Sequence, residues 1–182
     1  MKAAVLFKTK QKLKVVDIDL PNELFYGQVL VKIYYSGICG SQINEIDERK
    51  GKDKYLPHLL GHEGTGIIVK KNKNIKTLKV GDKVILHWKK GRGINSETPK
   101  YFYNKKKINA GWITTFNSYA VVSENRVSLI PKGVSMKEGV VFGCALTTAY
   151  GVIFNDAKLK DKDNLLILGT GNLGLSMICF AK

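Results

Sequence analysis

Apolar and β-branched residues occur in short runs along the first two-thirds of the chain, and turn residues separate the runs. Pro21, Asn22 and Gly27 interrupt the pattern early, and a Gly81-Asp82 turn leads into one of the later runs. Short runs bounded by such residues are typical of antiparallel strands. The pattern therefore predicts a mainly β, barrel-like domain. Its expected strands cover residues 1–7, 13–18, 28–35, 65–70, 83–88, 118–122 and 126–130.

The spacing of apolar residues becomes helical after Pro131. Ser135 is followed three residues later by Glu138, which is the pattern of a capping box at a helix N-terminus. We expect one helix over residues 135–142 and a second over residues 146–155, which carries the chain out of the barrel.

A different unit follows at the C-terminal end. The apolar run at residues 165–168 leads into Gly169, Gly171 and Gly174, and then into an apolar helical segment. Strand, glycine turn and helix form the first half of a βαβ unit, and a parallel strand needs neighbours on both sides. We therefore expect these residues to open a second domain whose remainder lies outside the 182 residues.

Composition and charge argue against a secreted, a nucleic-acid-binding or a membrane-binding protein. The chain has 182 residues, of which 44% are apolar and 25% charged, as in a globular protein. The first apolar run is too short for a signal peptide, so we expect the cytoplasm. The net charge is +15, but only Arg49, Arg92 and Arg126 of the 30 basic residues are arginines. Because the lysines are spread along the whole chain, we predict a solvated surface and no nucleic-acid or membrane partner.

The most irregular stretch is residues 89–111. It contains Gly91, Gly93, Pro99 and a lysine run at residues 105–107. We predict an exposed loop here.

Cysteine is scarce, and two cysteines stand in settings that suit a metal ion. Cys39 and Cys144 each lie beside glycines, and His62 lies in Gly61-His62-Glu63 just before an expected strand. Two thiolates and one neutral imidazole bind Zn²⁺ and leave a fourth position open, as catalytic zinc sites do. Each of these residues on its own also fits a role without a metal, because a lone cysteine is usually a buried apolar residue and a histidine beside a glutamate is usually a surface residue.

Five motifs together resemble the zinc-dependent medium-chain alcohol dehydrogenase family, over essentially the whole chain. The resemblance implies a GroES-like β-barrel catalytic domain at residues 1–145. A linking helix and the start of an NAD(P)-binding Rossmann domain, an incomplete βα unit, would follow at residues 146–182. In sequence order the motifs are Gly37-x-Cys39-Gly40-Ser41, Gly61-His62-Glu63-x-x-Gly66, Val80-Gly81-Asp82-x-Val84, Gly143-Cys144-x-x-Thr147-Thr148-x-Tyr150-Gly151 and Gly169-x-Gly171-x-x-Gly174.

The resemblance also implies roles for individual residues. Cys39, His62 and Cys144 correspond to the ligands of the catalytic zinc, and Glu63 to a carboxylate close to the metal. Ser41 corresponds to the hydroxyl that takes the substrate proton, and Thr148 to a residue that packs against the nicotinamide. The residues that correspond to the dinucleotide fingerprint are Gly169, Gly171 and Gly174.

The chain also departs from the family pattern. Many members bind a second, structural zinc through four cysteines in the stretch that corresponds to residues 89–111, which has no cysteine here. We therefore predict one catalytic zinc and no structural zinc. Gln42 replaces a common Asp, and Asn44 replaces the relay histidine of some members, so the orientation of His62 and the outer end of the proton relay differ from the family pattern.

The function implied is hydride transfer between an alcohol, polyol or sugar substrate and NAD or NADP, with no turnover by these 182 residues alone. Oligomers are expected only through a complete Rossmann domain. Two alternatives are a non-catalytic GroES-like binding or regulatory module, and a nucleic-acid binder that uses residues 100–107 with Tyr101, Phe102 and Tyr103 as a stacking platform. We assign no functional role to His58, His87 or Cys179, and we expect Cys179 in the core of a helix.

Overall fold

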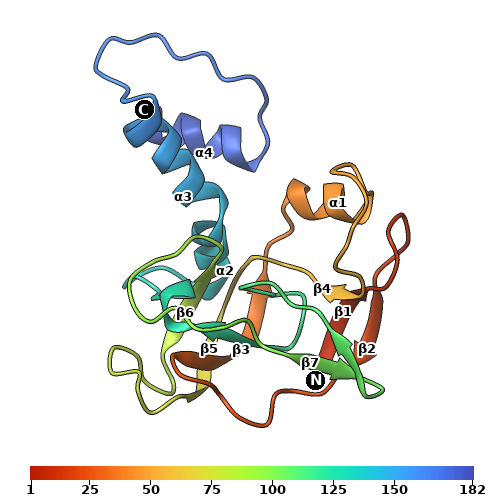
Figure 1. Cartoon of the computed structure of the whole chain (residues 1–182). Helices are drawn as coiled ribbons and strands as arrows, with labels where there is room; N and C mark the ends of the chain where they lie inside the picture. Colours follow the sequence, from red (N-terminus) through yellow and green to blue (C-terminus); the bar gives the residue numbers. More distant parts are fainter.

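The computed structural model describes all 182 residues and has a β-barrel body with helices at one side (Figure 1). Antiparallel pairing builds one five-stranded sheet, in the order β10-β6-β5-β3-β9, and one three-stranded sheet, in the order β2-β1-β4. The mainly β, barrel-like architecture predicted from the sequence is confirmed. The strands are β1 (Lys2–Leu6), β2 (Lys14–Asp17), β3 (Gln28–Ser36), β4 (His58–Leu59), β5 (Glu63–Lys71), β6 (Lys83–His87), β7 (Tyr101–Tyr103), β8 (Lys106–Ile108), β9 (Tyr119–Ser123) and β10 (Val127–Leu129).

Two apolar cores hold the barrel together. The larger core is formed mainly by side chains of the five-stranded sheet, and the smaller core joins β1 and β4 to the β7-β8 hairpin. Alternate positions of β3, β6 and β9 contribute to the larger core, as the period of a pleated strand requires: Val29 and Val31, Val84 and Leu86, and Ala120 and Val122. Removal of these side chains from water is the main favourable contribution to folding. The smaller core consists of Ala3, Val5, Ile18, Leu59, Tyr101 and Ile108.

The helices are short and lie toward the C-terminal end, except for α1 (Gly40–Ile46). Ser135 and Glu138 form the predicted capping box at α2 (Met136–Gly139), because the Ser135 hydroxyl accepts from the Glu138 amide and the Glu138 carboxylate accepts from the Ser135 amide. A 3-10 turn joins α2 to α3 (Ala145–Tyr150), which continues as a π-helical turn, Gly151–Asp156. The predicted helices at residues 135–142 and 146–155 are therefore present.

The last helix, α4 (Asn172–Ala181), packs on the linking helix. Phe180 makes edge-to-face contacts with Tyr150 and Phe154, at centroid distances of 5.7 and 6.1 Å. The two helices stand together at one side of the barrel (Figure 1). No single helix is long and apolar enough to cross a bilayer, although the bent pair Met136–Gly143 and Ala145–Asp156, with an angle of 47°, has the length and composition to do so.

Two local predictions were wrong. Residues 165–168 form no strand, and Leu166 and Leu168 are 82% and 89% exposed. A parallel strand exists only where neighbouring strands accept and donate its backbone hydrogen bonds, and these residues have no such neighbour. Cys179, expected in a helix core, is exposed on α4.

The prediction of an exposed loop at residues 89–111 was wrong for part of this stretch. The β7-β8 hairpin lies inside this stretch, and Tyr101 is fully buried. The Tyr101 hydroxyl accepts a hydrogen bond from the Val121 amide at 2.9 Å. Because Tyr101 belongs to the core, it is not available as a base-stacking residue.

Candidate zinc centre

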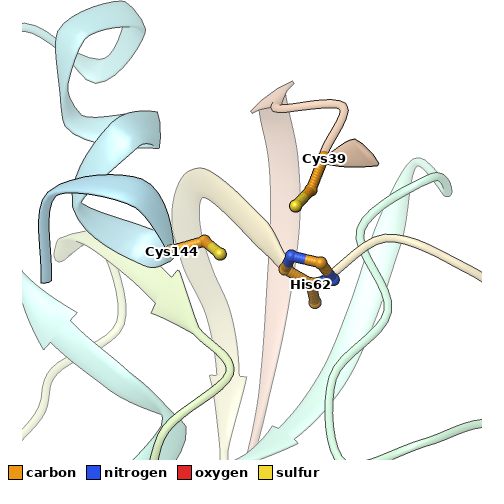
Figure 2. Close-up of side chains that lie close together, drawn as sticks. All are labelled: Cys39, His62 and Cys144. Atoms are coloured by element: carbon orange, nitrogen blue, oxygen red, sulfur yellow. The ribbon is translucent and has the colours of Figure 1, made fainter. Parts of the chain in front are cut away.

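Three chain segments bring the predicted ligands to one point. Cys39 precedes α1, His62 precedes β5 and Cys144 precedes α3. Their ligand atoms all lie within 4.8 Å of one another. Figure 2 shows the two sulfur atoms and the imidazole ring turned toward a common space. Residues that are 23 and 82 positions apart thus form one group of donors.

The backbone around His62 requires glycine. Gly61 has φ of +91°, and a Cβ at this position would overlap Thr115. The Gly61 amide donates to the side-chain oxygen of Gln42, which lies in α1. This hydrogen bond ties the segment that carries His62 to the helix that follows Cys39. Gln42 thus acts on the backbone beside His62, and no hydrogen bond joins it to the imidazole.

The chemistry of the three donors fits a zinc ion. Burial lowers the pKa of His62, and the nearby Lys50 lowers it further, so the ring is neutral at pH 7, as a metal ligand must be. Its Nε2 atom is buried and has no hydrogen-bond partner. Burial raises the pKa of the Cys144 thiol to about 12, with added contributions from Cys39 and Glu63. Without a metal the Cys144 thiol is therefore protonated at pH 7, and a bound cation would have to displace its proton.

Glu63 lines the same cleft as the three donors and is 5% exposed. Burial raises the pKa of its carboxyl group. Two glycines cover the side chain: a Cβ on Gly37 would lie 2.7 Å from Glu63 Cδ, and a Cβ on Gly143 would lie 2.7 Å from Glu63 Cβ. The glycines that precede Cys39 and Cys144 in the sequence thus make room for this carboxylate.

Two hydroxyl groups lie beside the sulfur atoms. Ser41 Oγ donates to Cys39 Sγ at 3.4 Å. The Thr148 hydroxyl hydrogen-bonds Cys144 and acts to lower the pKa of that thiol. Both residues line the same cleft as the three donors.

The cleft has a volume of about 700 Å³, which suits a small organic ligand. Gly171 and Asn172, at the start of α4, form its far side. Gly169 and Gly174 do not line the cleft but shape the turn: Gly169 has φ of +104°, and a Cβ on Gly174 would collide with the Gly169 carbonyl. The helix therefore presents its first amides toward the cleft, an arrangement that suits a phosphate group.

Lys50 and Trp88 also line the cleft, and both lie outside the sequence motifs. Trp88 directly follows β6, and its amide donates to the Gly143 carbonyl at 3.4 Å. Its position after a strand that ends near Cys144 was the available signal. Lys50 is exposed in the irregular segment after α1, where the sequence pattern carried no signal.

Comparisons with known proteins identify the family and the fold of the chain. The family model of the alcohol dehydrogenase GroES-like domain matches residues 26–132. Alcohol dehydrogenase 6 of Peromyscus maniculatus is 31% identical over an alignment of 205 positions, which covers all of this chain and 54% of that protein. S-(hydroxymethyl)glutathione dehydrogenase of Synechocystis is 28% identical and is covered to 55%.

Solved structures share the fold. The alcohol dehydrogenase zinc-binding domain protein of Burkholderia ambifaria superposes with a TM-score of 0.86 at 21% identity, over 99% of this chain and 55% of that one. Galactitol-1-phosphate dehydrogenase of Escherichia coli gives a TM-score of 0.76 at 25% identity, over 100% of this chain and 52% of that one. The chain thus spans about half the length of the relatives it matches.

Proposed function

We propose that this chain, which belongs to the zinc-type alcohol dehydrogenases of the medium-chain family, is the zinc-binding part of an NAD(P)-linked alcohol dehydrogenase. The observation that carries the proposal is the convergence of Cys39, His62 and Cys144 within 4.8 Å. A Cys₂His set with a free fourth position is the donor set of a catalytic zinc. In this proposal, residues 1–145 form the catalytic domain, and residues 146–182 form a linking helix and the first part of the NAD(P)-binding domain.

Cys39, His62 and Cys144 would hold one zinc ion. When bound, zinc supplies a Lewis acid that lowers the pKa of an alcohol toward about 7. The chain has only three cysteines, so a four-cysteine structural site cannot form within it. The two thiolates balance the charge of the cation, and Glu63 adds a negative charge beneath it.

Ser41 would accept the proton of the alcohol. Its hydroxyl lies at the sulfur of Cys39 and faces the cleft, so it can hold a proton between the substrate and the exterior. No histidine stands at Asn44 to continue the relay, so the proton would pass from Ser41 to water.

Thr148 and the turn at Gly169, Gly171 and Gly174 would bind the dinucleotide. The first amides of α4 suit its pyrophosphate, and Thr148 would pack against the nicotinamide ring. A nicotinamide held there would supply the acceptor for the hydride of the alcohol. A small alcohol or aldehyde, of the simple or the polyol or sugar type, is the proposed substrate class. Because these 182 residues include only one turn and one helix of a cofactor domain, we expect them to bind zinc without turnover.

Zinc content measured after equilibrium dialysis tests the proposal. The wild-type chain should retain a zinc ion that both Cys39→Ser and His62→Ala lose. Cys179→Ser is the matched control, because this cysteine is exposed on α4, and it should bind as wild type does. Zinc binding that is unchanged in Cys39→Ser and His62→Ala would refute the proposal.

A further inference from the structure

A second group of metal-ligating side chains lies outside the cleft. It consists of Glu45 in α1, Asp53 in the segment after α1, and His58 in β4. One ligand atom from each lies within 4.8 Å of the other two. The side chains of His58 and Asp53 are only 7% and 8% exposed, whereas that of Glu45 is 39% exposed, so the group lies at the edge of the interior.

Both ring nitrogens of His58 face oxygen acceptors. Nδ1 lies 3.1 Å from the Leu59 carbonyl oxygen, and Nε2 lies 2.7 Å from Asp53 Oδ2 and 3.7 Å from Glu45 Oε1. Either a proton or a metal ion must therefore lie between Nε2 and the two carboxylates. A histidine whose second nitrogen is held by a backbone carbonyl is the usual form of a metal ligand.

In each carboxylate, one oxygen accepts a hydrogen bond from a neighbouring group and the other oxygen faces His58. Asp53 Oδ1 accepts from the Tyr55 amide at 2.8 Å, which leaves Oδ2 toward His58. Glu45 Oε2 accepts from Gln42 Nε2 at 3.2 Å, which leaves Oε1 toward His58. Such outer hydrogen bonds orient the ligands of metal sites.

Charge balance favours a divalent cation over a proton. With a protonated His58 the group carries one net negative charge, whereas a divalent cation with neutral His58 brings it to zero. The ion pairs recorded for Glu45 and Asp53 are with His58 alone, so no lysine or arginine compensates them directly. Bonds of about 2.1 Å place neighbouring ligand atoms about 3 Å apart and opposite ones about 4 Å apart, close to the separations observed.

We propose that Glu45, Asp53 and His58 bind a divalent first-row transition-metal cation, separate from the zinc of the cleft. One imidazole and two carboxylates suit Mn²⁺ and Zn²⁺. The adjoining cavity of about 400 Å³ is lined by Glu45 and His58 and has room for water ligands. The ion would join α1, the segment after it and β4, and Gln42 would connect this site to the backbone at Gly61.

Manganese titration followed by electron paramagnetic resonance tests the proposal. The 182-residue chain is first loaded with one equivalent of zinc, which prefers the thiolate site, while Mn²⁺ prefers carboxylates. We expect one further equivalent of Mn²⁺ to bind, with pulsed spectra showing coupling to one imidazole nitrogen. This measurement uses the wild-type chain and needs no variant. No saturable binding, or binding without nitrogen coupling, would overturn the proposal and would leave a protonated His58 as the bridge.

Variants locate the site. Asp53→Asn and Glu45→Gln should each weaken Mn²⁺ binding at least about tenfold. Both amides keep an oxygen for the Tyr55 amide or for Gln42, so the local hydrogen bonds are retained. Asp47→Asn is the matched control, because Asp47 is an exposed acid paired with Arg49, and its binding should be unchanged. Equal affinity in Asp53→Asn and wild type would also overturn the proposal.

Discussion

Gly37 packs directly against the carboxyl group of Glu63, at a distance that leaves no room for a methyl group. A Cβ on Gly37 would lie 2.7 Å from Glu63 Cδ and Oε1. Gly143 covers the other side of the same side chain, so Glu63 cannot move away. The two glycines that stand beside the zinc-site cysteines therefore fix the position of a buried carboxylate.

Gly37→Ala should lower the free energy of unfolding by about 1–3 kcal/mol, because it overpacks this contact. Urea denaturation measures the change. In a Glu63→Ala background the same substitution should cost nothing, since the colliding atoms are gone. Gly151→Ala, where no atom lies within 4 Å, should be neutral or slightly stabilising. Equal costs of Gly37→Ala in both backgrounds would show that Glu63 is not the obstacle.

Lys105→Gly should stabilise the β7-β8 hairpin. Asn104 and Lys105 form its turn with φ of 50° and 62°, a conformation that costs a residue with a Cβ about 1–2 kcal/mol. The resulting Asn-Gly pair is the preferred two-residue hairpin turn. The melting temperature should rise by about 2–4 °C per kcal/mol gained. Lys106→Gly, within β8, should lower the melting temperature, and a rise there would contradict this account.

Stability should fall at alkaline pH through Tyr101. Burial raises its pKa from the ordinary value of 10 to about 12, so the folded state binds this proton more tightly than the unfolded state does. This tighter binding adds up to about 3 kcal/mol to the free energy of unfolding. The added stability is complete below pH 10 and is lost as the pH rises toward 12. Tyr101→Phe should be less stable than wild type at pH 8 but should lose less between pH 10 and 12. Urea titrations of both proteins at several pH values measure this difference. The same change in the free energy of unfolding with pH in both proteins would contradict the prediction.

Zinc binding should release protons from the chain. The pKa of Cys144 is about 12 in the metal-free state, so its thiol is protonated at pH 7 and must lose the proton to bind a metal. Because this one proton must leave, the apparent zinc affinity should rise about tenfold for each unit by which the pH is raised. Calorimetry in two buffers with different ionisation enthalpies counts the protons. Cys144→Ser should release about one proton fewer than wild type, and an equal count in both would refute this prediction.

The sequence predicted seven of the strands because each of them has an apolar run between turn residues; these are β1, β2, β3, β5, β6, β9 and β10, whereas the two-residue strand β4 carried no such run. The capping box of Ser135 and Glu138 was equally readable, since its signal lies within four residues. The β7-β8 hairpin was missed because Asn104-Lys105 is not a typical turn pair for two positive φ values. Helix α1 was missed because it is short and has no side-chain cap at its N-terminus.

The candidate site was predicted only in part. Short motifs with a family resemblance pointed to Cys39, His62 and Cys144, and the chain folds so that these distant residues meet. The group of Glu45, Asp53 and His58 carried no motif, and its existence depends on how the segment after α1 folds back onto β4. Tertiary contacts of this kind leave no periodicity in a single sequence.

X-ray absorption at the zinc edge of the chain loaded with one equivalent of zinc measures the donor set directly. We expect two sulfur neighbours at about 2.3 Å and an imidazole nitrogen at about 2.0–2.1 Å, with light-atom scattering from the fourth position. A spectrum with only nitrogen and oxygen neighbours, or with a single sulfur, would contradict the convergence of Cys39, His62 and Cys144 on one ion.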